Sequence, residues 1–179
     1  MQLTYGIAQT TEELAGILSL QKKNLRAVVS NEDREKEGFL TVSHNLQILT
    51  EMNNSCPHVI AKHANQVVGY TLCMHPKFGD KIPVLRPMFR EIEALDKKVE
   101  KYIVMGQVCI DKDYRGLGVF RKLYETMRQQ VSSSFTTIIT EVDATNTRSL
   151  NAHYAVGFSL LTTHRSHGQD WHLVALPTT

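Results

Sequence analysis

The stretch from Met105 to Met127 changes its pattern twice, and it constrains the fold more than any other part of the sequence. It begins as an apolar run, breaks at residues 111–113 and turns through residues 115–118, which contain two glycines. Apolar residues then recur on one side with helical spacing, namely Val119, Phe120, Leu123, Tyr124, Met127 and Val131. The sequence therefore predicts a strand, a glycine turn and an amphipathic helix in direct succession.

The glycine turn has the properties of an anion site. The first N–H groups of a helix lack partners within it, and the helix dipole adds partial positive charge there. Glycine lets a ligand approach the backbone closely, and Arg115, Arg121 and Lys122 add positive charge. We therefore expect the backbone of residues 116–120 to hold a phosphate group. The alternative is an ordinary strand–turn–helix corner that glycine makes easier.

Two nucleotide-binding patterns do not fit this turn. A G-x-G-x-x-G pattern would need glycine at Arg121, and the sequence contains no G-x-x-x-x-G-K-[ST]. The turn instead resembles the acyl-CoA pyrophosphate loop of the GNAT N-acetyltransferases, which reads Gln/Arg-x-x-Gly-x-Gly/Ala after a hydrophobic strand. Arg115 and Gly118 match that pattern, whereas Phe120 replaces the usual small residue. The resemblance implies that acetyl-CoA is the co-substrate and that its pyrophosphate binds at Arg115, Gly116, Leu117, Gly118, Val119 and Phe120.

A second stretch, from Asn146 to Phe158, resembles the other GNAT signature, Asn-x-x-Ser/Ala-x-x-x-Tyr-x-x-x-Gly-Phe. Asn146, Ser149 and His153 are spaced i, i+3 and i+7, so one helix face should carry them. The resemblance implies that this face lines the pantetheine arm and that its tyrosine protonates the departing thiolate. That position holds His153 here, and Tyr154 comes one residue late. Three alternatives stay open: His153 as acid, Tyr154 as acid, or a thiolate that leaves unassisted.

The resemblance also implies direct attack by an amine in a ternary complex. The main chain of Val108, Cys109 and Ile110 would pair with pantetheine, and an N–H near Val108 would polarise the thioester carbonyl. The amine needs a base, which in the family is often a carboxylate on the strand entering the glycine turn. Gln107 stands on that strand and could only bind or orient a water, so Glu141 on the next strand is the candidate base. A cationic acceptor could contact Asp33, Glu37 and Glu91 in the variable segments.

The order of predicted elements, β-α-α-β-β-β-α-β-α-β-β, is similar to the GNAT fold over nearly the whole chain. That fold is an α/β fold with a mixed, mostly antiparallel sheet, one splayed parallel strand pair and flanking helices. Helices should follow the caps Thr10 and Ser43 and the proline Pro87. The residues from His164 to Asp170 should form a turn, and residues 76–100 form either a wall over the substrate or a surface excursion. The predicted strands are Leu3–Ile7, Val59–His63, Val67–Met74, Tyr102–Ile110, Phe135–Val142, Phe158–Thr163 and Trp171–Leu176.

Composition narrows the remaining possibilities. A length of 179 residues suits one domain spanning 1–179, and a net charge of +2 without basic runs does not favour nucleic-acid binding. No apolar run reaches the roughly 18 residues of a membrane span, and the three cysteines are scattered, so we expect a cytoplasmic protein. His164 and His167 are too sparse to suggest zinc, so no metal is expected. A homodimer, a catalytically weak acyl-CoA sensor and an acyltransferase for protein or peptide amines remain alternatives.

Overall fold

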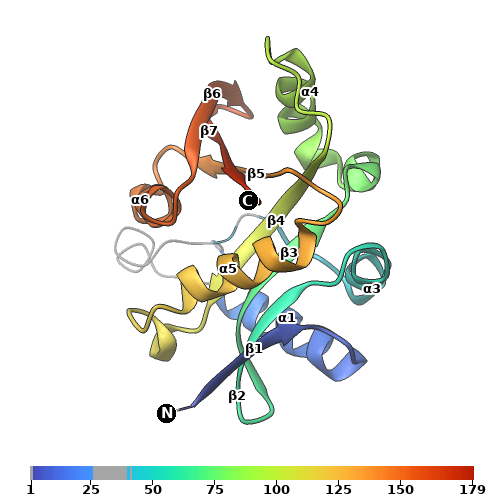
Figure 1. The fold of residues 1–179 in the computed structure, drawn as a ribbon, viewed down its shortest axis with the longest axis vertical. Helices are drawn as coiled ribbons and strands as arrows, with labels where there is room; N and C mark the ends of the chain where they lie inside the picture. The colour runs from blue at the N-terminus through green and yellow to red at the C-terminus, as the bar shows by residue number, and fades with distance from the viewer. Residues whose placement is uncertain (1, 26–39, 41) are drawn as a thin grey trace.

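The computed structural model describes residues 2–25, 40 and 42–179. Its strands and helices follow one another in the order expected from the sequence, with the helix expected at Pro87 lying between the third and fourth strands (Figure 1). The strands are β1 (Leu3–Ile7), β2 (Val59–His63), β3 (Gln66–Met74), β4 (Tyr102–Ile110), β5 (Thr137–Asp143), β6 (Ser159–Ser166) and β7 (Gln169–Pro177). The helices are α1 (Thr11–Asn24), α3 (Leu46–Ser55), α4 (Arg86–Ala94), α5 (Val119–Val131) and α6 (Thr147–Ala155), with 3₁₀ turns η1 (Pro76–Lys81), η2 (Pro83–Leu85) and η3 (Lys112–Tyr114).

The described strands form one sheet in the order β1-β2-β3-β4-β5-β7-β6. Strands β4 and β5 are the only parallel neighbours in the described part of the chain, and the other pairs are antiparallel. The parallel pairing covers only Tyr102–Val104 against Thr137–Ile139. Beyond that point the two strands separate, which confirms the predicted mixed sheet with a splayed parallel pair.

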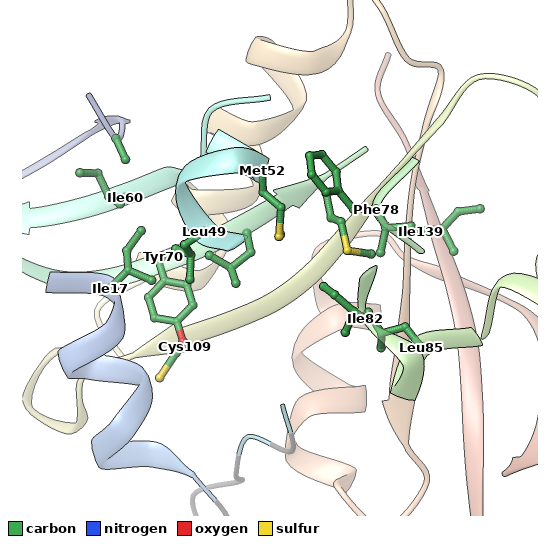
Figure 2. Packing of buried hydrophobic residues seen from close by; sticks show 14 of the residues in the cluster. Ile17, Leu49, Met52, Ile60, Tyr70, Phe78, Ile82, Leu85, Cys109 and Ile139 are labelled. Carbon is green, nitrogen blue, oxygen red and sulfur yellow. The ribbon is translucent and has the colours of Figure 1, made fainter. Parts of the chain in front are cut away.

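The two faces of the sheet carry separate cores because successive strand residues point to opposite sides. On one face, α1, α3 and α4 bury side chains such as Ile17, Leu49 and Met88 against the strands. Figure 2 shows this core, in which Tyr70 lies beside Ile17 and Cys109. On the other face, α5 buries Leu123 and Met127, and α6 adds Leu150.

The described sheet contains three β-bulges, one between β2 and β3 at Ala61 and Lys62, one in β4 and one in β6, and the last two change which side chains reach each face near the site. In β4, Met105 pairs with Cys73 and Gln107 with Leu72, so Gly106 is the extra residue. In β6, the pairing register shifts in the same way between Leu160 and Thr162. Because an extra residue reverses the inward and outward alternation, each bulge moves the following side chains to the opposite face.

Two local predictions were wrong. The cap of α3 is Asn45 rather than Ser43, because Asn45 Oδ1 accepts a hydrogen bond from the Ile48 N–H at 2.9 Å. The expected turn from His164 to Asp170 is shorter, since β6 continues to Ser166 and β7 begins at Gln169. The tight turn between them works because His167 and Gly168 both adopt positive φ.

Residues 76–100 belong to the core on the α1 side. Phe78, Ile82 and Leu85 from the 3₁₀ turns are buried there together with Met88 and Ile92 of α4. The segment is therefore packed into the molecule and is not a surface excursion. Within the described residues, no helix is both long enough and apolar enough to traverse a bilayer.

Candidate active site

A cavity of about 370 Å³ lies where β4, the glycine turn, α5, α6 and the end of α1 meet. Ten of the eleven residues predicted to bind the cofactor line it: Val108, Cys109, Ile110, Arg115, Gly116, Gly118, Val119, Phe120, Asn146 and Ser149. The eleventh, Leu117, has a side chain that is 55% exposed and does not line the cavity. A larger hollow of about 760 Å³ lies between the α4–β4 connection and β5, β6 and β7, away from the glycine turn.

The glycine turn has open space around its backbone. Gly116 and Gly118 have φ values of +75° and +76°, in the left-handed region that glycine adopts without strain. A Cβ placed on either residue would meet no atom within 4 Å. Gly118 caps α5 without a side-chain hydrogen bond to the helix, so the first N–H groups of α5 stay available for an anion.

Among the described residues, two groups at the cavity wall bond Arg115. Its Nε donates to the Ile110 carbonyl oxygen at 3.0 Å, and its Nη2 donates to Asn24 Oδ1 at 2.9 Å. Asn24 ends α1, and its carbonyl oxygen accepts a hydrogen bond from the Leu40 N–H at 3.0 Å. Asn24 and Leu40 both line the cavity, although neither was predicted as a site residue.

One edge of β4 faces the space left by the separation of β5. Past Val104 and Ile139 no pairing joins the two strands in the described residues, so β4 keeps unpaired backbone groups on that side. Val108, Cys109 and Ile110 lie on this part of β4 and line the cavity. An extended ligand could add to this edge as an extra strand.

Helix α6 presents a different face to the cavity from the one predicted. Asn146 caps the helix by accepting a hydrogen bond from the Ser149 N–H at 3.2 Å, and both residues line the cavity. The third predicted member, His153, does not line it. Ala152 and Val156 take its place, and helical spacing from Ser149 could have identified them.

His153 is instead buried between α5 and α6, with 1% of its surface exposed. Its Nδ1 lies 2.7 Å from the Ser149 carbonyl oxygen, which can only accept, so Nδ1 carries the proton. Nε2 then accepts a hydrogen bond from the Tyr124 hydroxyl at 2.8 Å. Phe120 and Phe158 pack edge-on against the ring, and burial lowers the pKa of His153 to about 4. These contacts are the physical reason that His153 faces the core as a neutral imidazole.

Tyr154, the other candidate acid, lies outside the cavity lining as well. Its side chain is 39% exposed, and its hydroxyl is 3.2 Å from His172 Nδ1 on β7. The structure therefore places neither candidate acid on the cavity wall.

The side-chain amide of Gln107 links three segments to β4 through hydrogen bonds. Its Oε1 accepts hydrogen bonds from Gln21 Nε2 at 2.7 Å and from the Tyr70 hydroxyl at 2.6 Å, and its Nε2 donates to the Val42 carbonyl oxygen at 2.8 Å. Gln21 Oε1 also accepts a hydrogen bond from the His44 backbone N–H at 2.8 Å, and Gln21 Nε2 lies 2.9 Å from His44 Nδ1. The Gln107 amide is thus occupied by protein partners and does not line the cavity, so a bound water would have to compete with them.

Glu141 lies on β5 past the last residue that pairs with β4, in the separated part of the strands, and it does not line the cavity either. Its Oε2 is 3.0 Å from His164 Nε2 on β6, and the two side chains are only 12% and 5% exposed. Burial raises the pKa of Glu141 to about 8. The sequence identified Glu141 but placed His164 in a turn.

The remaining candidates have simpler settings. Glu91 lies at the larger hollow beside α4, and Asp33 and Glu37 lie outside the described residues. Cys56, Cys73 and Cys109 are buried free thiols, and burial raises the pKa of Cys109 to about 12. Across the described residues, no three His, Cys, Asp or Glu side chains gather as metal ligands would.

Comparison with known proteins decides the family. The model of the Acetyltransferase (GNAT) family matches residues 24–158, which include both signatures. The chain belongs to the GNAT family. It is therefore an N-acetyltransferase that uses acetyl-CoA. A comparison with curated proteins finds no match.

Solved structures with this GNAT fold resemble the chain along its full length. The ribosomal-protein-S18-alanine N-acetyltransferase from Escherichia coli has a TM-score of 0.68 at 13% identity, covering 99% of this chain and 95% of that one. The NatC complex bound to Gag peptide and CoA contains a chain with a TM-score of 0.67 at 18% identity, with full coverage of both. The yncA protein from Salmonella typhimurium, solved with its cofactor acetyl-CoA, gives 0.65 at 14% identity, covering 99% and 94%. At these identities the likeness concerns the fold.

Proposed function

We propose that this GNAT enzyme transfers the acetyl group to a primary amine by direct attack in a ternary complex, with Glu141 as the base. The observation that carries the proposal is a carboxyl group buried in the separated part of β5, on the sheet face opposite α5 and α6. A carboxyl group in that place can take a proton from an amine that approaches β4 from the α1 side.

The residues around the cavity suit an acyl-CoA. Acetyl-CoA supplies the acetyl group as a thioester. The N–H groups of residues 116–120 and the Arg115 guanidinium would hold its diphosphate, because both present positive charge to the same open space. Val108, Cys109 and Ile110 would pair with its pantetheine arm through their main chain, and an N–H near Val108 would polarise the carbonyl.

The proposed reaction forms one bond and breaks another at the acetyl carbonyl carbon. Glu141 takes a proton from the amine nitrogen as the N–C bond forms, and the C–S bond breaks to release the thiolate. A thiol has an ordinary pKa of about 8.5, so its thiolate can leave near neutral pH without a dedicated acid. This choice among the three alternatives is supported by the positions of His153 and Tyr154 away from the cavity.

The proposal is tested by release of the CoA thiol from acetyl-CoA in the presence of n-propylamine, spermidine and a tripeptide with a free N-terminus. We expect release with at least one amine, and a loss of roughly 100-fold or more in kcat for Glu141→Gln, the scale of general-base catalysis. Binding of CoA, measured by calorimetry, should stay unchanged in that variant. Tight CoA binding without release on any amine would instead favour the acyl-CoA sensor.

Three further expectations stay predictions from the sequence: a single domain over 1–179, a cytoplasmic location and a homodimer. The acceptor's identity is likewise open, and a peptide or protein amine is the alternative to a small molecule. The tripeptide in the amine panel separates these two classes.

A further inference from the structure

The bulge in β6 determines where His164 points. Ser159 pairs with Ala175 on the face that carries the α1 core, so strict alternation would put residues 161, 163 and 165 on that face. The extra residue, Leu161, shifts the alternation, and His164 comes to that face opposite Trp171. Bulges that re-aim a side chain are common beside active sites.

The re-aimed imidazole meets Glu141 from across β7. Its Nε2 is 3.0 Å from Glu141 Oε2. The other carboxyl oxygen, Oε1, makes no hydrogen bond within the described part of the chain. It is also not fully enclosed by protein atoms. Glu141 therefore has one oxygen held by the protein and one that remains within reach of a ligand.

We propose that His164 is a positioning residue: its Nε2–H fixes Oε2 of Glu141, so that Oε1 faces the attacking amine. This rests on the proposed role of Glu141 as base. A carboxylate that is free to rotate would spend part of its time aimed away from the amine, and fixing a catalytic group avoids that loss. A donor at Oε2 favours the charged form of the carboxyl group, which opposes the effect of burial on its pKa.

Several other titratable groups on this face are bonded elsewhere or deeply buried. Asp143 Oδ1 accepts hydrogen bonds from the backbone and the hydroxyl of Thr145, at 2.8 and 2.7 Å. The Tyr70 hydroxyl is bound to Gln107, and His44 to Gln21. Cys109 is a buried thiol whose pKa burial raises to about 12. His164 is thus the group on this face that is bonded to Glu141.

The test compares His164→Ala, His164→Gln and His167→Ala. Glutamine carries its Nε2 the same number of bonds from Cα as histidine, so it can donate to Oε2, whereas alanine cannot. His167 is a matched control on the same hairpin, in the turn, where Ser166 is the one partner of its ring among the described residues. Using the amine that gives most thiol release, we expect kcat to fall roughly 10- to 100-fold in His164→Ala, the scale of one lost hydrogen bond to a charged group. The KM for acetyl-CoA should be unchanged, and His164→Gln should restore most of the rate.

A second readout does not depend on the acceptor. The Glu141 carboxyl carbon, labelled with ¹³C and assigned by its loss in Glu141→Gln, is titrated by NMR. Removing the donor should raise its midpoint in His164→Ala and leave it unchanged in His167→Ala. A wild-type kcat and an unmoved midpoint in His164→Ala would overturn the positioning role. Should Glu141→Gln keep full activity while the midpoint still moves in His164→Ala, the proposed base would fail and the contact between the two residues would stand. If His164→Ala does not fold, His164→Asn takes its place, because its side chain is too short to reach Oε2.

Discussion

Arg115 Nη2 donates a hydrogen bond to Asn24 Oδ1 at 2.9 Å, across 91 residues of sequence. The bond joins the glycine turn to the last residue of α1, and the Asn24 main chain in turn holds Leu40. Both Asn24 and Leu40 line the cofactor cavity. Asn24 therefore orients the guanidinium that we expect to meet the diphosphate.

The first prediction concerns Asn24. In Asn24→Ala the guanidinium loses one of its fixed partners, and we expect the Kd for CoA to rise roughly fivefold, the scale of one net hydrogen bond. Asn24→Asp should weaken CoA binding further, because a carboxylate would stand beside the negatively charged diphosphate. Calorimetry measures both, with Asn54→Ala as control, since Asn54 is an exposed asparagine near the end of α3. Equal affinity in all three variants would show that Asn24 does not orient Arg115 for the ligand.

The second prediction concerns Gly118. A side chain there costs about 1–2 kcal/mol because of its positive φ, and the same holds for Gly168 in the β6–β7 turn, where φ is +79°. Neither glycine has an atom within 4 Å of an added Cβ. Gly118→Ala and Gly168→Ala should therefore lose similar stability in urea unfolding, but only Gly118→Ala should lose affinity for CoA.

A larger side chain at Gly118 should have a stronger effect on CoA binding than alanine does. Gly118→Trp should abolish detectable CoA binding, because its ring would occupy the space where the diphosphate is expected. Circular dichroism checks that the fold is retained. Unchanged CoA affinity in Gly118→Trp would show that the glycine turn does not bind the diphosphate.

The parts of the site that could be predicted from the sequence are local ones. The strand, the glycine turn and α5 follow one another within about 30 residues, and their signals are glycine, charge and helical spacing. Residues whose role depends on a distant partner gave no such signal. Asn24 is an ordinary helix-end residue until the fold brings Arg115 beside it.

Side-chain direction was the other source of error. The expected face of α6 included His153, but the aromatic rings of Phe120, Tyr124 and Phe158 provide a buried place for the imidazole. His164 was assigned to a turn, because a strand that contains a bulge does not show strict alternation. Both errors arise from packing between helices and strands. The residue pattern within a single helix or strand carries no information about that packing.

The third prediction separates the two candidate acids. Tyr154→Phe removes a hydroxyl that bonds His172 outside the cavity, so kcat should stay within about twofold of wild type. His153→Ala leaves the Tyr124 hydroxyl without its partner and opens a cavity in the core, and it should cost roughly 2–4 kcal/mol in urea unfolding. Steady-state kinetics on Tyr154→Phe decide the matter for that residue: a tenfold lower kcat would make it the acid after all.

The fourth prediction concerns stability and pH at Glu141. Burial raises the pKa of this carboxyl group in the folded protein from its ordinary value of 4.5 to about 8. The folded state therefore favours the protonated form. Its stabilising contribution is present below pH 4.5 and is lost as the pH rises to about 8.

Glutamine keeps the shape and carries no charge, so Glu141→Gln should lack that loss. Each pKa unit corresponds to about 1.4 kcal/mol, so the variant should gain a few kcal/mol relative to wild type between pH 5 and pH 9. Urea unfolding at pH 5, 7 and 9 measures the difference, with the half-exposed Glu125→Gln as control. Parallel stability curves for wild type and Glu141→Gln would show that the carboxyl group has the same pKa in the folded and the unfolded protein, so that burial does not make it a stronger base.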